Sequence, residues 1–155
     1  MSKKDLGLLL LRSGAGVILM AHGYPKLFGG PGKEPPAPAA GLLGPNFPEA
    51  VEKGGPESFA ETLKHLGVPQ PQVAAVVAGL SEFGGGLGMI LGLQTRPAGL
   101  LAATTMAVAA RKAHWEKGFF GQGGFEFPAL LGLVGLSLAL TGPGAISIDR
   151  LLGKA

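Results

Sequence analysis

Five ionisable side chains lie in or beside the hydrophobic stretches of this chain, where charge is otherwise scarce. They are Arg12, His22, Glu82, His114 and Glu126. A charge in the hydrocarbon core of a bilayer is costly, so ionisable residues in such stretches usually face a bundle interior and mark functional sites. Guanidinium, imidazole and carboxylate groups can form ion pairs, hydrogen bonds and proton relays there. The pattern indicates a small integral membrane protein with a polar interior.

The composition supports this class of protein. Of the 155 residues, 46% are hydrophobic and only 15% are charged, and the mean hydropathy is +0.37. The net charge of +3 is scattered without a Lys/Arg stripe, so we expect no nucleic-acid partner. The chain has no cysteine, which excludes disulfides, thiolate metal sites and thiol redox chemistry within it.

Four apolar segments predict the elements that position these side chains. They cover residues 6–28, 73–93, 97–114 and 125–141. Arg12 interrupts the first segment and no small-residue cleavage site follows it, so we interpret it as a retained span rather than a signal peptide. The third and fourth are close to the lower limit of ~17 residues for a span. We predict a single all-α domain over residues 1–155, an integral membrane four-helix bundle.

The segment between the first two spans, residues 29–71, has a different character. It is rich in glycine and proline, and residues 30–48 show no apolar period, so we expect an irregular loop there. Residues 56–66 predict a short amphipathic helix, because Phe59, Leu63 and Leu66 recur at helical spacing after Pro56. This helix should lie on the membrane surface or cap the bundle.

Four antiparallel spans place the long loop and residues 111–124 on one side and both termini on the other. We expect a bacterial inner-membrane protein with both termini in the cytoplasm. Most large aromatic residues fall near the loop-rich face, which fits either an interfacial belt or the mouth of a site for an apolar, ring-shaped ligand. Because polar groups occupy the same layer, we predict a ligand-binding pocket there, lined by His22, Lys26, His114 and Glu126.

Deeper in the bundle, Arg12 and Glu82 predict an interior ion pair. Arg12 lies about six residues inside one boundary and Glu82 about ten inside the other, which gives compatible depths at ~1.5 Å per residue once the long arginine reaches inward. Small residues around Glu82 allow close backbone approach. Such a pair can lock the bundle or set the electrostatics of a site, and both roles stay open.

Other patterns point to packing or to no site at all. Gly84, Gly88 and Gly92 form a small-residue stripe that favours packing within the monomer over a homo-oligomer contact. Bis-histidine ligation of haem by His22 and His114 is disfavoured, because both lie near helix ends. The sequence has no P-loop, nucleophile elbow, dinucleotide fingerprint or zinc motif, and we expect no metal site.

The order of several short motifs is specific. In the first two thirds they are Leu10-Leu11-Arg12 with Gly16, His22-Gly23-Tyr24-Pro25-Lys26, Leu66-Gly67-Val68-Pro69, Glu82-Phe83-Gly84-Gly85-Gly86 and Leu91-Gly92-Leu93-Gln94-Thr95-Arg96. The later ones are His114 before Gly118-Phe119, Glu126-Phe127-Pro128, and Gly142-Pro143-Gly144 before Ser147-Ile148-Asp149. Together they resemble the DoxX family of bacterial four-helix membrane proteins. The Pro/Gly-rich insert from Gly29 to about Gly55 departs from the family pattern.

The resemblance implies a function as well as a fold. The family is similar to the DoxD subunit of thiosulfate:quinone oxidoreductase, and other members are linked with membrane redox complexes. It therefore implies a membrane-embedded redox module that handles a quinone or another small electron carrier, with a partner protein. On this hypothesis His22, Lys26 and His114 hydrogen-bond quinone carbonyls. A non-catalytic scaffold subunit and a carrier of small solutes or lipids remain open, as does whether the chain is itself an enzyme.

Overall fold

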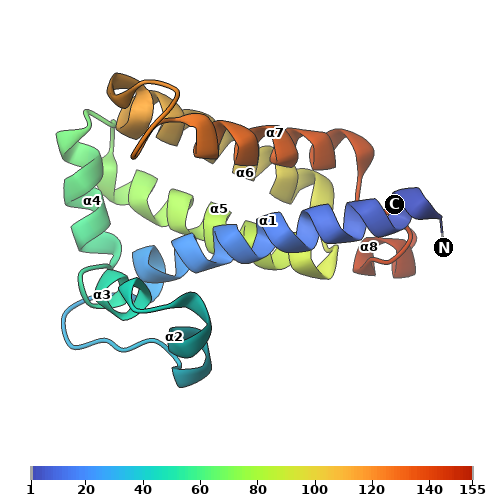
Figure 1. The fold of residues 1–155 in the computed structure, drawn as a ribbon, viewed down its shortest axis with the longest axis horizontal. Coiled ribbons are helices and arrows are strands. Elements are labelled where there is room, and N and C mark those ends of the chain that lie inside the picture. Colours follow the sequence, from blue (N-terminus) through green and yellow to red (C-terminus); the bar gives the residue numbers. More distant parts are fainter. Residues whose placement is uncertain (1, 155) are drawn as a thin grey trace.

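The structure, a computed structural model, describes residues 2–154, which form helices and turns and no strand (Figure 1). Four long helices run side by side. They are α1 (Lys3–Phe28), α5 (Pro71–Leu91), α6 (Thr95–Ala109) and α7 (Glu126–Thr141). Short helices α2 (Ala37–Leu43), α3 (Asn46–Glu52) and α4 (Pro56–His65) gather at one end, and α8 (Ile148–Leu151) lies at the other with both termini. We call these the loop end and the terminus end.

Each long helix coincides with one predicted apolar segment. By length and composition, α1 and α5 are sufficient to cross a membrane, and α7 is a shorter apolar helix. Helix α6 ends at Ala109, and the chain continues through a π-helical turn (Ala110–His114) and a 3-10 turn (Trp115–Lys117). The third predicted segment therefore remains helical to His114 but changes type over its last turn.

Glycines bring the long helices together in two closely packed pairs, α1 with α5 and α6 with α7. A Cβ added to Gly16 of α1 would lie 2.6 Å from the carbonyl oxygen of Gly86 on α5, and one on Gly86 would lie 2.5 Å from that of Gly16. Gly99 and Gly135 have the same reciprocal relation between α6 and α7. Only the absence of a side chain permits such close backbone contact. A core that includes Leu19, Met89 and Leu138 joins the pairs.

The helices of the long insert agree only in part with the prediction. Helix α4 is confirmed, and it buries Ala60 and Leu63 against Ala75 of α5. The irregular loop expected over residues 30–48 is wrong, because α2 lies within it and α3 begins within it. Proline is tolerated in the first turn of a helix, so a Pro-rich segment can still form short ones. Phe47 and Val51 of α3 are buried, and Val51 accepts a backbone hydrogen bond from Gly30 at 2.8 Å.

The three glycines of the predicted stripe on α5, Gly84, Gly88 and Gly92, do not form a single packing surface. A Cβ on Gly84 would meet nothing within 4 Å, whereas one on Gly88 would lie 2.9 Å from the carbonyl oxygen of Leu93. Gly92 ends α5 in the left-handed conformation, with a φ of 64°. Gly88 and Gly92 thus serve the tight turn into α6, and the structure leaves Gly84 alone on an open face.

Candidate functional site

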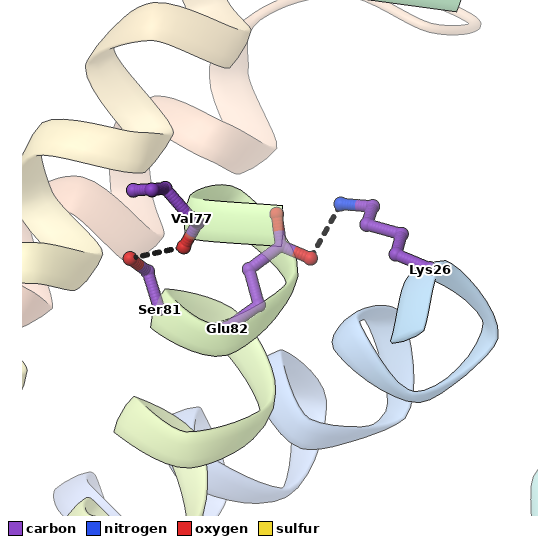
Figure 2. A network of polar contacts seen from close by, with 4 residues as sticks. All are labelled: Lys26, Val77, Ser81 and Glu82. Atoms are coloured by element: carbon purple, nitrogen blue, oxygen red, sulfur yellow. Dashed lines mark hydrogen bonds and ion pairs between the residues drawn. The ribbon is translucent and has the colours of Figure 1, made fainter. Parts of the chain in front are cut away.

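The carboxylate of Glu82 is buried between α1 and α5 and pairs with Lys26. The Glu82 side chain is 3% exposed and that of Lys26, in the last turn of α1, is 24% exposed. Figure 2 shows the two side chains pointing toward each other from neighbouring helices. The adjacent hydroxyl of Ser81 donates to the carbonyl of Val77 at 2.7 Å, within α5. Lys26 also lies over the ring of Phe59 on α4, 4.8 Å from its centre.

The predicted ion pair between Arg12 and Glu82 is therefore wrong, although both residues are buried. The guanidinium of Arg12 donates to the carbonyls of Met89 and Ile90, both at 2.6 Å, and to that of Ile146. In the antiparallel α1–α5 pair Arg12 lies beside the C-terminal end of α5, about two turns from Glu82. The last carbonyls of a helix lack intrahelical partners and carry partial negative charge, so they attract a cation.

A second buried charge at the terminus end was not identified from the sequence as a site residue. Asp149 of α8 accepts hydrogen bonds from the backbone N–H groups of Gln94 (2.8 Å) and Thr95 (2.9 Å), at the start of α6. Burial raises the pKa of this carboxyl, but the hydrogen bonds from Thr95 and Gln94 outweigh it, so the pKa lies below its usual range. Its sequence signal, an acid shortly after a Gly-Pro-Gly turn, gives no indication of a partner about 55 residues earlier.

At the loop end, the structure brings all four predicted ligand-binding residues to one cavity of about 360 Å³. His22, Lys26, His114 and Glu126 line it together with Glu82. The polar groups come from α1, α5, the turn after α6 and the start of α7, so the cavity requires all four long helices. Apolar side chains complete the wall: Leu19, Met106, Phe127, Pro128 and Leu131. We call this space the inner cavity.

The inner cavity has a roof formed by the backbone of a glycine-rich loop. Gly121, Gly123 and Gly124 line it, and the ring Nδ1 of His114 lies 2.7 Å from the carbonyl oxygen of Gly123. The imidazole therefore ties the glycine-rich loop across the cavity when Nδ1 carries a proton. His22 faces Phe127 of α7 with 6.3 Å between ring centres. The site thus offers several hydrogen-bond donors and two carboxylates against flat and aliphatic walls.

The aromatic residues agree only partly with an aromatic mouth. Among the large aromatics, Phe127 lines the inner cavity. The others pack mainly on one another: Trp115 stacks on Phe125 at 4.9 Å, and the ring of Phe28 meets that of Phe83 at 5.0 Å. Most of the aromatic layer consequently stabilises the loop end rather than forming the walls of the site.

Taken together, apolar helices packed through glycines and a polar cavity at one end are consistent with a helical membrane protein. The family model DoxX matches residues 7–115, and the chain belongs to the DoxX family. Inner membrane protein YqjF of Escherichia coli (strain K12) is 40% identical over 96 residues, which cover 59% of this chain and 70% of the relative. Inner membrane protein YphA of the same strain is 34% identical over 110 residues, covering 67% and 76%. No solved structure matches the chain significantly.

Proposed function

We propose that this protein is a bacterial inner-membrane module that binds the head group of a quinone, or of a similar flat electron carrier, in the inner cavity. Two relatives are named as inner membrane proteins, and α1 and α5 are long and apolar enough to cross a bilayer. In this proposal α6 and α7 cross as well, completing a four-helix bundle. They contain 15 and 16 residues, a length that local thinning of the bilayer accommodates.

The observation that carries the proposal is the meeting of polar and apolar groups in the inner cavity. A quinone-like ring needs hydrogen-bond donors for its carbonyls and flat apolar surfaces for its faces. His22, Lys26 and His114 supply the donors, and Phe127 and Leu131 supply apolar wall. A cavity of about 360 Å³ falls in the lower part of the range typical of small-molecule sites.

In this proposal each side chain has a distinct task. A bound quinone would supply the electron-carrying chemistry, within a complex that includes a partner protein. Lys26 donates a hydrogen bond while it neutralises Glu82, so that the buried carboxylate is tolerated. His114 holds the roof loop through Gly123, and Glu126, at the start of α7, accepts or releases a proton at the rim.

The test is retention of quinone by the protein purified in mild detergent. We expect a stoichiometric quinone in the extracted lipids of the wild type, and its loss in the double variant His22→Ala, His114→Ala. The matched control is His65→Ala, because His65 is an exposed histidine on α4 outside the cavity lining. Unchanged retention in the double variant would contradict the proposal. A stable partner protein without quinone would favour the scaffold role instead.

A further inference from the structure

A second hollow lies beside the inner cavity, between α1 and the short helices of the insert. Its volume is about 690 Å³, and α1, α3, α4 and the start of α7 contribute to its lining. Its apolar wall includes Val17, Ile18, Ala21, Phe47 and Phe59. We call this space the outer groove. The insert that departs from the family pattern thus builds one of its walls.

The outer groove and the inner cavity share three lining residues. His22, Lys26 and Phe127 belong to both. They stand where α1 passes α7, and these two helices pack far less closely than α1 packs on α5. Phe127 is 46% exposed. Side chains rather than packed helix backbones therefore separate the two spaces at this point.

The two spaces differ in polarity. The inner cavity has five ionisable residues in its lining, whereas Lys53 is the ionisable residue that the outer groove adds to the shared His22 and Lys26. Val17 and Ala21 lie in the middle of α1, the longer of the two candidate membrane helices. The outer groove therefore runs from the depth of lipid acyl chains toward the loop end, and it meets the inner cavity beside His22.

We infer that the outer groove holds the apolar tail of the molecule whose head group occupies the inner cavity. This inference rests on the proposed function and narrows its ligand class to an amphiphile, a quinone with an isoprenoid-like tail, rather than a tailless ring. A head in the inner cavity and a tail in the outer groove are joined through the passage between His22 and Phe127. The polar head group of one molecule then contacts the inner cavity, and its apolar tail contacts the outer groove. Such a molecule can enter the site laterally from the bilayer without passing through water.

The test compares two probes in lipid nanodiscs: a benzoquinone with a decyl tail and the same ring with a methyl group in its place. We expect the wild type to bind the tailed quinone about tenfold more tightly, after correction for partition into empty nanodiscs. Ala21→Trp and, from the opposite wall, Ala50→Trp fill the outer groove without touching the inner cavity. Each should remove the tail preference and leave binding of the tailless quinone unchanged.

The control is Val76→Trp, which introduces the same side chain at an exposed position of α5 that lines neither space. It should keep the tail preference. Equal affinity of the wild type for both probes would overturn the tail site while leaving the proposed function standing. A preference that survives both groove variants would show that the tail binds outside the outer groove, and it would also overturn the inference. Failure of the wild type to bind either probe would defeat the proposed function itself.

Discussion

Buried charges have different partners at the two ends of the bundle: backbone groups at the terminus end and another side chain at the loop end. At the terminus end, Arg12 and Asp149 direct their charges at backbone groups, the last carbonyls of α5 and the first N–H groups of α6. At the loop end, Lys26 and Glu82 pair with each other beside a cavity whose lining also includes His22, His114 and Glu126. In the first arrangement every hydrogen bond that the structure shows for these two side chains goes to backbone groups of the fold, although the buried Nε of Arg12 has no partner among the described residues. The second keeps polar groups available around open space.

This difference separates a structural use of charge from a binding use. A charge satisfied by helix ends fixes the position of those ends, and replacing it should affect stability first. Charged and polar groups around a cavity can bind a ligand, and replacing them should affect ligand retention first. Arg12 at one end and the Lys26–Glu82 pair at the other both lie along the α1–α5 seam, so these charges are compared within a single pair of helices.

The largest effect is expected for Arg12→Met. The change leaves three carbonyls at the terminus end without the donor that Arg12 provides and removes a cation near Asp149, so we expect a loss of roughly 4 kcal/mol of stability. The measurement is unfolding in mixed detergent micelles followed by circular dichroism. Arg96→Met is the matched control, since exposed Arg96 also donates to two carbonyls; it should cost about 1 kcal/mol. A similar loss in both variants would remove the special role of the buried guanidinium.

Lys26→Met should have a smaller effect on stability and a larger one on binding. It leaves the buried Glu82 carboxylate unpaired, at a cost of about 2 kcal/mol, because Lys26 is itself partly exposed. The double variant Lys26→Met, Glu82→Gln should regain part of that stability but still retain no quinone. Thermal unfolding and lipid mass spectrometry of the same preparations check both statements. Additive losses in the double variant would contradict the pairing.

The shared seam itself is tested by Gly86→Ala. The added Cβ would lie 2.5 Å from the carbonyl oxygen of Gly16, so α1 and α5 must move apart, at a cost of about 2 kcal/mol. Gly84→Ala is the control two residues away, where a Cβ meets nothing within 4 Å and helix propensity improves. Unfolding of the two variants should therefore shift in opposite directions. Equal shifts would mean that the seam tolerates separation.

The smallest effect is a pH dependence at the terminus end. Because the pKa of Asp149 is lowered in the folded protein, its stabilisation is present above the pKa of the unfolded chain and is lost as the pH falls through the folded-state pKa. Asp149→Asn should cost about 1 kcal/mol at neutral pH. That difference from the wild type should disappear in acid. A difference that persists unchanged in acid would contradict this role of the Asp149 carboxylate.

The sequence predicted the local elements well and the partners of the charges less well. Hydrophobic runs, first-turn prolines and glycine stops located the long helices and α4, because these signals act within one or two turns. The pairing of Arg12 failed because it depends on the register between α1 and α5. Gly16 and Gly86 set that register, and it brings Lys26 rather than Arg12 to Glu82.

What the sequence determined by itself is the helical, apolar character of the chain and the layer in which His22, Lys26, His114 and Glu126 lie. Those properties follow from residue type and from distance along the chain. Only the tertiary structure decided that Glu82 joins these residues at one cavity, that Arg12 and Asp149 hold the opposite end, and that the insert forms a groove beside His22. The physical reason is that close packing of one helix on another selects which turns meet, and a shift of two turns exchanges one charge partner for another.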